Sequence, residues 1–331
     1  LVCHEQTGAY VKSTAGRPAE GVDLLSAAQS VARPTRANCG ACHFYGGGGD
    51  AVKHGDLDSS LTYPPEEVDV HMGQQGFECV DCHRATDHQI LGRSISVSVD
   101  DANQVACSDC HSLEPHPEER LNAHTDAVAC QTCHIPAVAV REPTKVEWDW
   151  STAGQDWPED LHEYLKIKGS FVYAANYTPE YAWYNGVVAD RYLLGDEIDP
   201  AIVTVLNPPA GSIADPSARI WPFKAHRGIQ PYDVFYRYLL QPKTVGEGGF
   251  WTNFDWDQAF RLGSQATGFP YSGQYGWART EMFWPLTHMV APAGNALQCS
   301  ECHSPEGRLD WLQLGYPGDP IVWGSRISGE D

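Results

Sequence analysis

Five copies of the pattern Cys-x-x-Cys-His recur along the chain and constrain its fold more than any other feature. They run from Cys39 to His43, Cys79 to His83, Cys107 to His111, Cys130 to His134 and Cys299 to His303. Two cysteines at this spacing can form thioethers to a porphyrin, and the histidine that follows can take one axial position of its iron. A zinc site would use paired Cys-x-x-Cys motifs without needing that histidine. The pattern predicts covalent haem c at Cys39, Cys42, Cys79, Cys82, Cys107, Cys110, Cys130, Cys133, Cys299 and Cys302, with His43, His83, His111, His134 and His303 as axial ligands.

Cys3 is the one cysteine of the 11 that lies outside these motifs. His4 follows it directly, so residues 1–4 match the second half of a further copy. A free thiol near the start of the sequence is the alternative interpretation. We expect a sixth haem at Cys3 with His4 as axial ligand, and we expect the sequence to begin inside a longer polypeptide.

Six porphyrins would supply large apolar faces for the polypeptide to wrap. The 31 glycines and 23 prolines among 331 residues indicate many loops and turns. We therefore expect a mainly α fold with extensive loops, a multihaem cytochrome c fold in which haems form much of the core. Short helices are predicted at 158–166, 232–240 and 256–262, and the best strand pattern is at 94–99.

The haem motifs are unevenly spread along the sequence. Residues 1–136 form a haem-dense region, 137–298 an aromatic-rich segment without motifs, and 299–331 the last haem and a tail. The middle segment is too rich in tryptophan for a disordered linker, so we expect one integrated domain to which it supplies axial ligands. A run of four glycines at 46–49 predicts unusual backbone angles or a plain flexible loop.

A formal charge of −21 excludes nucleic acid as a partner and favours cationic redox proteins. An anionic substrate would require a local basic pocket that stands out against this charge. The sequence holds no apolar run of about 18 residues, so no membrane span is expected. Haem attachment to these motifs is completed outside the bacterial cytoplasm, as in c-type cytochromes generally, which predicts a periplasmic or extracellular protein.

A haem that only transfers electrons needs a second axial ligand, whereas a haem that binds substrate needs a displaceable one. Short tethers to the motifs favour four histidines as second ligands, and two more lie in similar Trp-Pro contexts. His162 lies in a polar stretch and is expected at the surface. The predicted second ligands are His71, His88, His116, His124, His226 and His288.

Lys53 and His54 lie together in the loop after the first complete motif. One interpretation is a solvated lysine beside a ligating His54. The other is that Lys53 itself ligates iron, because burial and the metal charge both lower the pKa of an amine. An amine is more easily displaced than imidazole, so a haem with lysine as its ligand would suit catalysis.

Three stretches resemble the octahaem tetrathionate reductase family. They are Cys-Gly-Ala-Cys-His-Phe-Tyr with four glycines and Asp-Ala-Val-Lys-His-Gly-Asp-Leu-Asp at 39–58, His-Thr-Asp-Ala-Val-Ala-Cys-Gln-Thr-Cys-His at 124–134, and Trp-Pro-Leu-Thr-His-Met-Val-Ala-Pro at 284–292. The resemblance implies a mostly helical, loop-rich fold related to octahaem nitrite reductases and hydroxylamine oxidoreductases. It also implies a haem with a lysine ligand, Lys53, an aspartate nearby, Asp50, and His4 on the opposite side of that haem.

Members of this family reduce tetrathionate, nitrite or hydroxylamine. The sequence departs from the family in showing six motifs rather than eight and in lacking the family's active-site cysteine. Seven histidines together with Lys53 would nevertheless make eight second ligands, a full set for an octahaem parent.

Two functions remain open. The first is a reductase that passes electrons from redox proteins or quinol-linked donors to a small oxidised sulfur or nitrogen compound at the Lys53 haem, with Asp50 handling protons. The second is a non-enzymatic electron conduit, as part of a larger assembly, a homo-oligomer or a filament, in which every haem has two fixed ligands.

Overall fold

The structure is a computed structural model and describes residues 1–11, 13, 17–95 and 103–326. The chain divides into two compact units. Unit 1 contains residues 1–144, 175–179 and 286–310, and unit 2 contains residues 145–174, 180–285 and 311–331. The boundaries at 136 and 298 expected from motif spacing remain a prediction.

Unit 1 is built from short helical turns joined by loops. Its helices are α1 (Leu24–Gln29), α2 (Arg36–His43), η1 (Ser59–Thr62), the π-helical η2 (Val70–Gln74), α3 (Cys79–Cys82), η3 (Cys107–Asp109), α4 (Glu119–His124), α5 (Cys130–His134), η5 (Ala293–Asn295) and α8 (Cys299–Cys302). Two strands, β1 (Ala85–Thr86) and β2 (Gln89–Ile90), form a small hairpin.

Each complete haem motif forms or ends a helical turn, as expected. Acidic residues inside three of the motifs stabilise the starts of these turns. Asp81 accepts a hydrogen bond from the Glu78 amide (2.8 Å), Asp109 accepts one from the Ala106 amide (2.9 Å), and Glu301 accepts one from the Gln298 amide (2.8 Å). A side chain that caps the first turn satisfies an amide that has no partner within the helix. The cap fixes the turn that holds the two cysteines.

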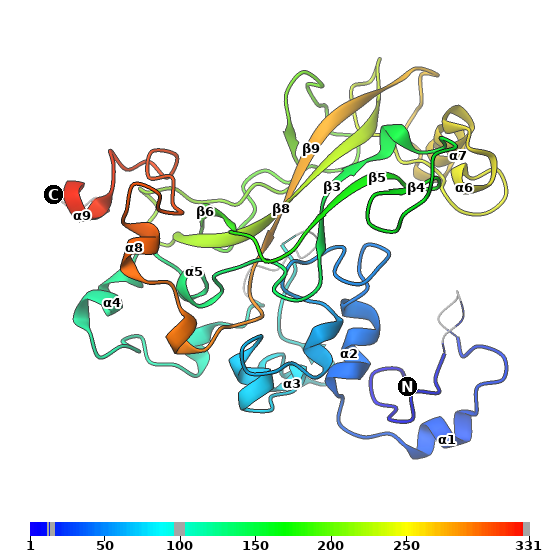
Figure 1. Cartoon of the computed structure of the whole chain (residues 1–331). Helices are drawn as coiled ribbons and strands as arrows, with labels where there is room; N and C mark the ends of the chain where they lie inside the picture. Colours follow the sequence, from blue (N-terminus) through cyan, green and yellow to red (C-terminus); the bar gives the residue numbers. More distant parts are fainter. Residues whose placement is uncertain (12, 14–16, 96–102, 327–331) are drawn as a thin grey trace. The chain divides into compact units, whose positions relative to one another are not determined.

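Unit 2 contains most of the seven-stranded sheet in the described chain (Figure 1). The strands are β3 (Thr144–Asp149), β4 (Tyr164–Leu165), β5 (Gly169–Ala174), β6 (Glu180–Tyr184), β7 (Thr204–Val205), β8 (Arg219–Asp233) and β9 (Tyr275–Pro285). Their order is β4-β5-β3-β8-β9-β7, and β6 pairs with another stretch of β8. The helices of this unit are η4 (Trp150–Thr152), α6 (Phe250–Asn253), α7 (Trp256–Thr267) and α9 (Pro320–Trp323).

The expectation of a mainly α fold is wrong, because 23% of the residues are helical and 19% lie in strands. Strands β8 and β9 pair antiparallel from Phe223–Pro285 to Asp233–Tyr275. Two prolines, Pro222 and Pro231, interrupt the β8 sequence. They weaken its strand pattern, because proline removes a strand hydrogen bond. Its aromatic residues, which favour strands, were the signal for the sheet.

The helix predicted at 256–262 is confirmed and extends to Thr267. Asp255 caps its first turn by accepting from the Gln258 amide (3.0 Å), and Gly268 ends it with a φ of 79°. The helices predicted at 158–166 and 232–240 are wrong. The first region contains turns and β4, and the second contains the end of β8 and a turn. The strand pattern at 94–99 falls largely outside the described residues.

The apolar core of unit 1 consists of small separate clusters. One contains Phe44, Leu61, Val68 and Met289, all at most 4% exposed. A second contains Ile135, Val138, Ala139 and Leu286. The aromatic residues of the middle segment pack in unit 2, where the Phe250 and Trp256 rings stack 3.7 Å apart.

Candidate haem sites

Five histidines of the attachment motifs each lie opposite a second histidine in unit 1. The ring centres are 6.0 to 6.2 Å apart in every pair. The pairs are His4 with His88, His111 with His71, His83 with His288, His134 with His116, and His303 with His124. Each pair thus joins one predicted first ligand to one predicted second ligand.

This spacing fits a metal ion between the rings. Two imidazoles that bind one metal through bonds of about 2 Å each place their ring centres roughly 6 Å apart. Within the described residues, no group of three or more histidine, cysteine or acidic side chains could hold a metal by itself. Iron in a porphyrin needs only axial ligands from the chain, so a facing pair of imidazoles fits it.

The distance along the sequence to an attachment motif led us to predict which histidines are second ligands. It does not indicate which motif histidine each of them faces. His88 follows His83 by five residues yet faces His4, and His116 follows His111 by five residues yet faces His134. His124 likewise faces His303 rather than His134, the histidine of the motif that follows it in the sequence. Each short tether therefore links two neighbouring haem sites.

A tight hairpin turn positions His88. Strands β1 and β2 pair Thr86 with Gln89, which leaves Asp87 and His88 as the turn. Both have positive φ angles, 51° and 65°, as a two-residue hairpin turn requires. Glycine is the usual residue there, and a histidine in this conformation carries strain. The imidazole of His88, which faces His4, gives a reason for histidine at a position where glycine would be less strained.

Hydrogen bonds at the other ring nitrogen orient several of these imidazoles. The Nδ1 atoms of His4, His83 and His124 lie 3.0, 2.8 and 2.7 Å from the backbone oxygens of Ala32, Leu91 and Arg120. Metal-binding histidines commonly donate their second ring N–H in this way, which fixes the tautomer and leaves Nε2 for the metal.

His288 has an acidic partner instead of a carbonyl. Its Nδ1 lies 3.3 Å from Oδ2 of Asp56, a buried carboxylate. The same oxygen accepts hydrogen bonds from the Thr287 amide (2.6 Å) and the His288 amide (2.9 Å). Although burial opposes ionisation, these contacts hold the pKa of Asp56 below its usual value, and the carboxylate raises the pKa of His288.

The loop that carries Lys53 is held firmly at its backbone. The buried hydroxyl of Thr144 donates to the Ala51 oxygen (2.6 Å) and the His54 oxygen (3.1 Å), and the Ala139 amide donates to Gly55 (2.5 Å). A Cβ added at Gly46 would lie 3.2 Å from Cδ of Lys53, so the glycine run gives the lysine stem room. Gly47 and Gly48 have φ angles of 83° and 93°.

Asp50 and Asp58 lie in the same region. The Asp50 carboxylate accepts from the Ser59 amide (2.9 Å) and from the Ser59 hydroxyl. Asp58 is 1% exposed and caps η1 by accepting from the Ser60 amide (2.9 Å). Burial, with the nearby charge of Asp50, raises the pKa of Asp58 to about 6. A carboxyl group with this pKa can hold or release a proton near neutral pH.

His226 lies on β8 in unit 2 and shows the same orienting bond as the paired histidines. Its Nδ1 is 3.0 Å from the backbone oxygen of Lys145, and burial lowers its pKa to about 4. The Lys145 ammonium lies 3.5 Å from the ring centre of Phe171 and 4.0 Å from that of Trp148. Lys145 and Lys224 are at most 1% exposed, so buried basic residues gather here in an acidic chain.

Cysteines of successive motifs lie beside one another in unit 1. The Cys39 and Cys79 side chains lie within hydrogen-bonding reach of each other. Cys107 and Cys130 form the same contact. The second cysteines also neighbour each other, Cys82 with Cys110 and Cys133 with Cys302. Along the sequence the motifs therefore meet alternately through their first and second cysteines.

Comparison with solved structures explains this arrangement. The octahaem cytochrome c of Shewanella oneidensis matches the chain with a TM-score of 0.90 and 48% identity, over 97% of this chain and 76% of that one. The chain belongs to the octahaem c-type cytochromes. Its cofactor is haem c, as the motifs predicted. The bacterial cytochrome c family matches residues 145–306 of this cytochrome.

A curated relative of the cytochrome is an uncharacterized protein from Archaeoglobus fulgidus, which is 30% identical over 114 residues. The match covers 29% of this chain and 38% of the relative. The chain thus spans well under half the length of that protein. No helix among the described residues of the cytochrome is long and apolar enough to cross a membrane.

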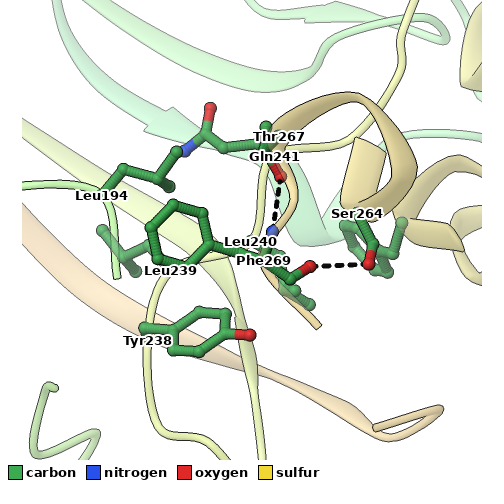
Figure 2. Close-up of a pocket in the computed structure, with 9 residues that line it drawn as sticks. Leu194, Tyr238, Leu239, Leu240, Gln241, Ser264, Thr267 and Phe269 are labelled. Atoms are coloured by element: carbon green, nitrogen blue, oxygen red, sulfur yellow. Dashed lines mark hydrogen bonds between the residues drawn. The ribbon is translucent and has the colours of Figure 1, made fainter. Parts of the chain in front are cut away.

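Unit 2 also contains a small cavity (Figure 2). Its wall includes Leu194, Tyr238 and Phe269, and the Ser264 hydroxyl closes the nearby turn by donating to the Phe269 oxygen (2.6 Å). It contains no candidate iron ligand. His162 contacts the ring of Tyr173 (4.9 Å) in the same unit and is exposed, as the sequence suggested.

Sequence reasoning missed the residues that support the ligands. Asp56, Thr144 and the Lys145 carbonyl act through hydrogen bonds to residues 81 to 232 positions away. Asp56 lies two residues after His54, but no motif indicated that it would meet His288. Only its position in the stretch 39–58 singled it out.

Proposed function

We propose that this octahaem-type cytochrome is a reductase that carries electrons along a row of haems to a small oxidised sulfur or nitrogen compound, such as tetrathionate, nitrite or hydroxylamine. The observation that carries the proposal is the rigid loop of Lys53, in which the buried Thr144 hydroxyl holds the Ala51 and His54 oxygens. Five other haem positions have imidazole on both sides, as relay haems require. Substrate chemistry then belongs to a haem outside the five pairs.

Six attachment sites imply six haems in this chain. The neighbouring cysteines support an electron path that follows the order of the motifs, from Cys39 through Cys79, Cys107 and Cys130 to Cys299. Bound haem c supplies one-electron transfer and an iron centre. The chain's own residues set the order of the haems and fix both faces of five of them.

Lys53 is the ligand that suits the catalytic haem. Its backbone neighbours are fixed by Thr144, so its amine is presented from a rigid loop. The sequence resemblance placed His4 opposite Lys53, whereas the His4 ring faces the His88 ring at 6.0 Å, which supports His88 as the second ligand of that haem. We therefore propose that Lys53 serves a haem other than those of the five pairs. His43, the remaining motif histidine, belongs to one such haem.

Reduction of these substrates consumes protons. Asp50 is held by Ser59, and Asp58, with its raised pKa, lies close enough to interact with it electrically. We propose that these two carboxyl groups hold the protons that the reaction takes up.

Haem attachment outside the cytoplasm supports a periplasmic or extracellular location, with redox proteins or quinol-linked enzymes as electron donors. A second candidate function is an electron conduit, in a homo-oligomer or a filament. The five bis-histidine positions favour it, because haems with two fixed ligands serve relay only.

Turnover with a viologen donor and each of the three substrates distinguishes the two functions. The Lys53→Ala variant should lose at least tenfold in turnover and change the spectrum of one haem, while His162→Ala, an exposed control, should match the wild type. Full activity of Lys53→Ala, or a wild-type spectrum with bis-histidine haems alone, would remove the reductase proposal.

A further inference from the structure

In one of the five histidine pairs, a carboxylate holds one of the rings. His4, His83 and His124 are oriented by neutral backbone oxygens. His288, opposite His83, is oriented by the Asp56 carboxylate at 3.3 Å. The haem attached at Cys79 and Cys82 would therefore have a charged group at its second ligand.

Asp56 is built to keep that charge. It is 2% exposed, and its Oδ2 accepts from two consecutive amides, those of Thr287 (2.6 Å) and His288 (2.9 Å). Within the described residues, no lysine or arginine forms an ion pair with it. Its negative charge is therefore directed at the imidazole rather than cancelled by a cation.

One neutral group competes for the same ring nitrogen. The Thr287 hydroxyl oxygen lies 3.2 Å from Nδ1 of His288, slightly closer than the carboxylate. An ionised acceptor forms the stronger hydrogen bond at similar distance. Asp56 thus dominates the polarisation of the ring, and Thr287 weakens it only by sharing the N–H.

We propose that Asp56 is a positioning residue that lowers the reduction potential of the haem attached at Cys79 and Cys82 by giving His288 imidazolate character. A carboxylate that accepts the second ring N–H makes a histidine a more basic ligand. A more basic ligand and a nearby negative charge both favour ferric over ferrous iron. The inference rests on the proposed ligation of this haem by His83 and His288.

The same loop then serves two haem sites. Asp56 lies three residues after Lys53, and the bonds of Thr144 and Ala139 hold the backbone between them. A haem of low potential is a strong electron donor. One loop therefore carries both Lys53, the proposed catalytic ligand, and Asp56, which would lower the reduction potential of the donor haem.

Spectroelectrochemical titration of the haem-loaded protein without substrate tests the proposal. In Asp56→Asn, one haem should become easier to reduce by about tenfold in equilibrium constant, or about 59 mV, with an altered low-spin EPR signal. Asp69→Asn is the matched control. Asp69 is also buried and its negative charge also acts on His288. Its carboxylate, however, accepts from the Met72 (2.8 Å) and Val290 (3.2 Å) amides rather than from the ring, so its variant should shift the potential clearly less. Equal shifts in both variants, or none in Asp56→Asn, would overturn the proposal.

Thr287→Val provides a test that does not depend on the folding of Asp56→Asn. Loss of the competing hydroxyl should strengthen the bond to Asp56 and lower the potential of the same haem, whereas a rise or no shift would contradict the proposal. These measurements need no turnover. Shifted potentials in a protein that is inactive as a reductase would support the proposal for Asp56 and reject the proposed function. Unshifted potentials in an active reductase would support the proposed function and reject the proposal for Asp56.

Discussion

The imidazole of His88 lies 6.0 Å from that of His4, ring centre to ring centre, and meets it at 76°. A hairpin turn with two positive φ angles delivers it there. This pair shows that the half motif at Cys3 and His4 has the same two-histidine arrangement as four complete motifs. This arrangement supports the proposal that a haem at Cys3 would relay electrons rather than bind substrate.

Replacing His88 tests this assignment. We expect His88→Ala to open one axial position, which should add a high-spin signal to the electronic and EPR spectra of the ferric protein. His88→Gly should do the same and also relax the turn, because glycine adopts positive φ without strain. The glycine variant should be more stable than the alanine variant by about 1 kcal/mol. Unchanged spectra in both variants would show that His88 is not a ligand.

Cys3 is predicted to carry one haem through a thioether. In a protein that begins at Leu1, Cys3→Ser should therefore release one haem under denaturing conditions and leave the other five attached. Intact mass spectrometry of the denatured protein measures this directly. The matched control is Cys299→Ser, where Cys302 remains to hold its haem. An unchanged haem count in Cys3→Ser would support the free-thiol interpretation.

The attachment motifs predict the haem-binding cysteines and histidines from the sequence alone, because their spacing is fixed by one porphyrin. The pairing of ligands was not readable. His116 and His134 face each other with rings almost parallel, at 4°, although His111 is the nearer motif histidine to His116 in the sequence. Axial pairing depends on how neighbouring motifs pack, and that packing is set in three dimensions.

The sheet was missed for a different reason. Strand β8 contains two prolines and a mixed burial pattern, so it lacks the alternation by which a half-buried strand is recognised. Its partner β9 follows in the sequence only after α6 and α7. By contrast, α7 carries its own start and stop signals in Asp255 and Gly268, and local signals of this kind are visible without tertiary context.

Gly263 in α7 is expected to be required for the fold of unit 2. A Cβ at this position would lie 1.7 Å from the backbone oxygen of Gln241, which cannot move aside as a side chain could. Gly263→Ala should destabilise the protein by about 3 kcal/mol. Gly268→Ala is the control, because its Cβ would meet nothing within 4 Å and only its φ of 79° is unfavourable, at a cost of about 1 kcal/mol. Denaturant unfolding compares the two, and similar losses would contradict the clash.

Asp58 is expected to make stability fall as pH rises. Its pKa in the folded protein is about 6, raised mainly by burial from the usual 3.8. Between these values the unfolded chain ionises first, so the unfolded state binds fewer protons and the free energy of unfolding declines with pH. The full penalty applies above about pH 6, where Asp58→Asn should stabilise the protein by roughly 2 kcal/mol. Asparagine can still cap η1.

Denaturant unfolding of the ferric protein at pH 4 and pH 7.5 measures this effect. The gain from Asp58→Asn should be present at pH 7.5 and nearly absent at pH 4, where Asp58 is protonated in the folded state and half protonated in the unfolded chain. Asp255→Asn alters an exposed cap on α7 and should give no comparable gain at pH 7.5. Equal gains from Asp58→Asn at both pH values would point to packing rather than to ionisation. Asp58 would then be unsuitable as a proton donor to Asp50.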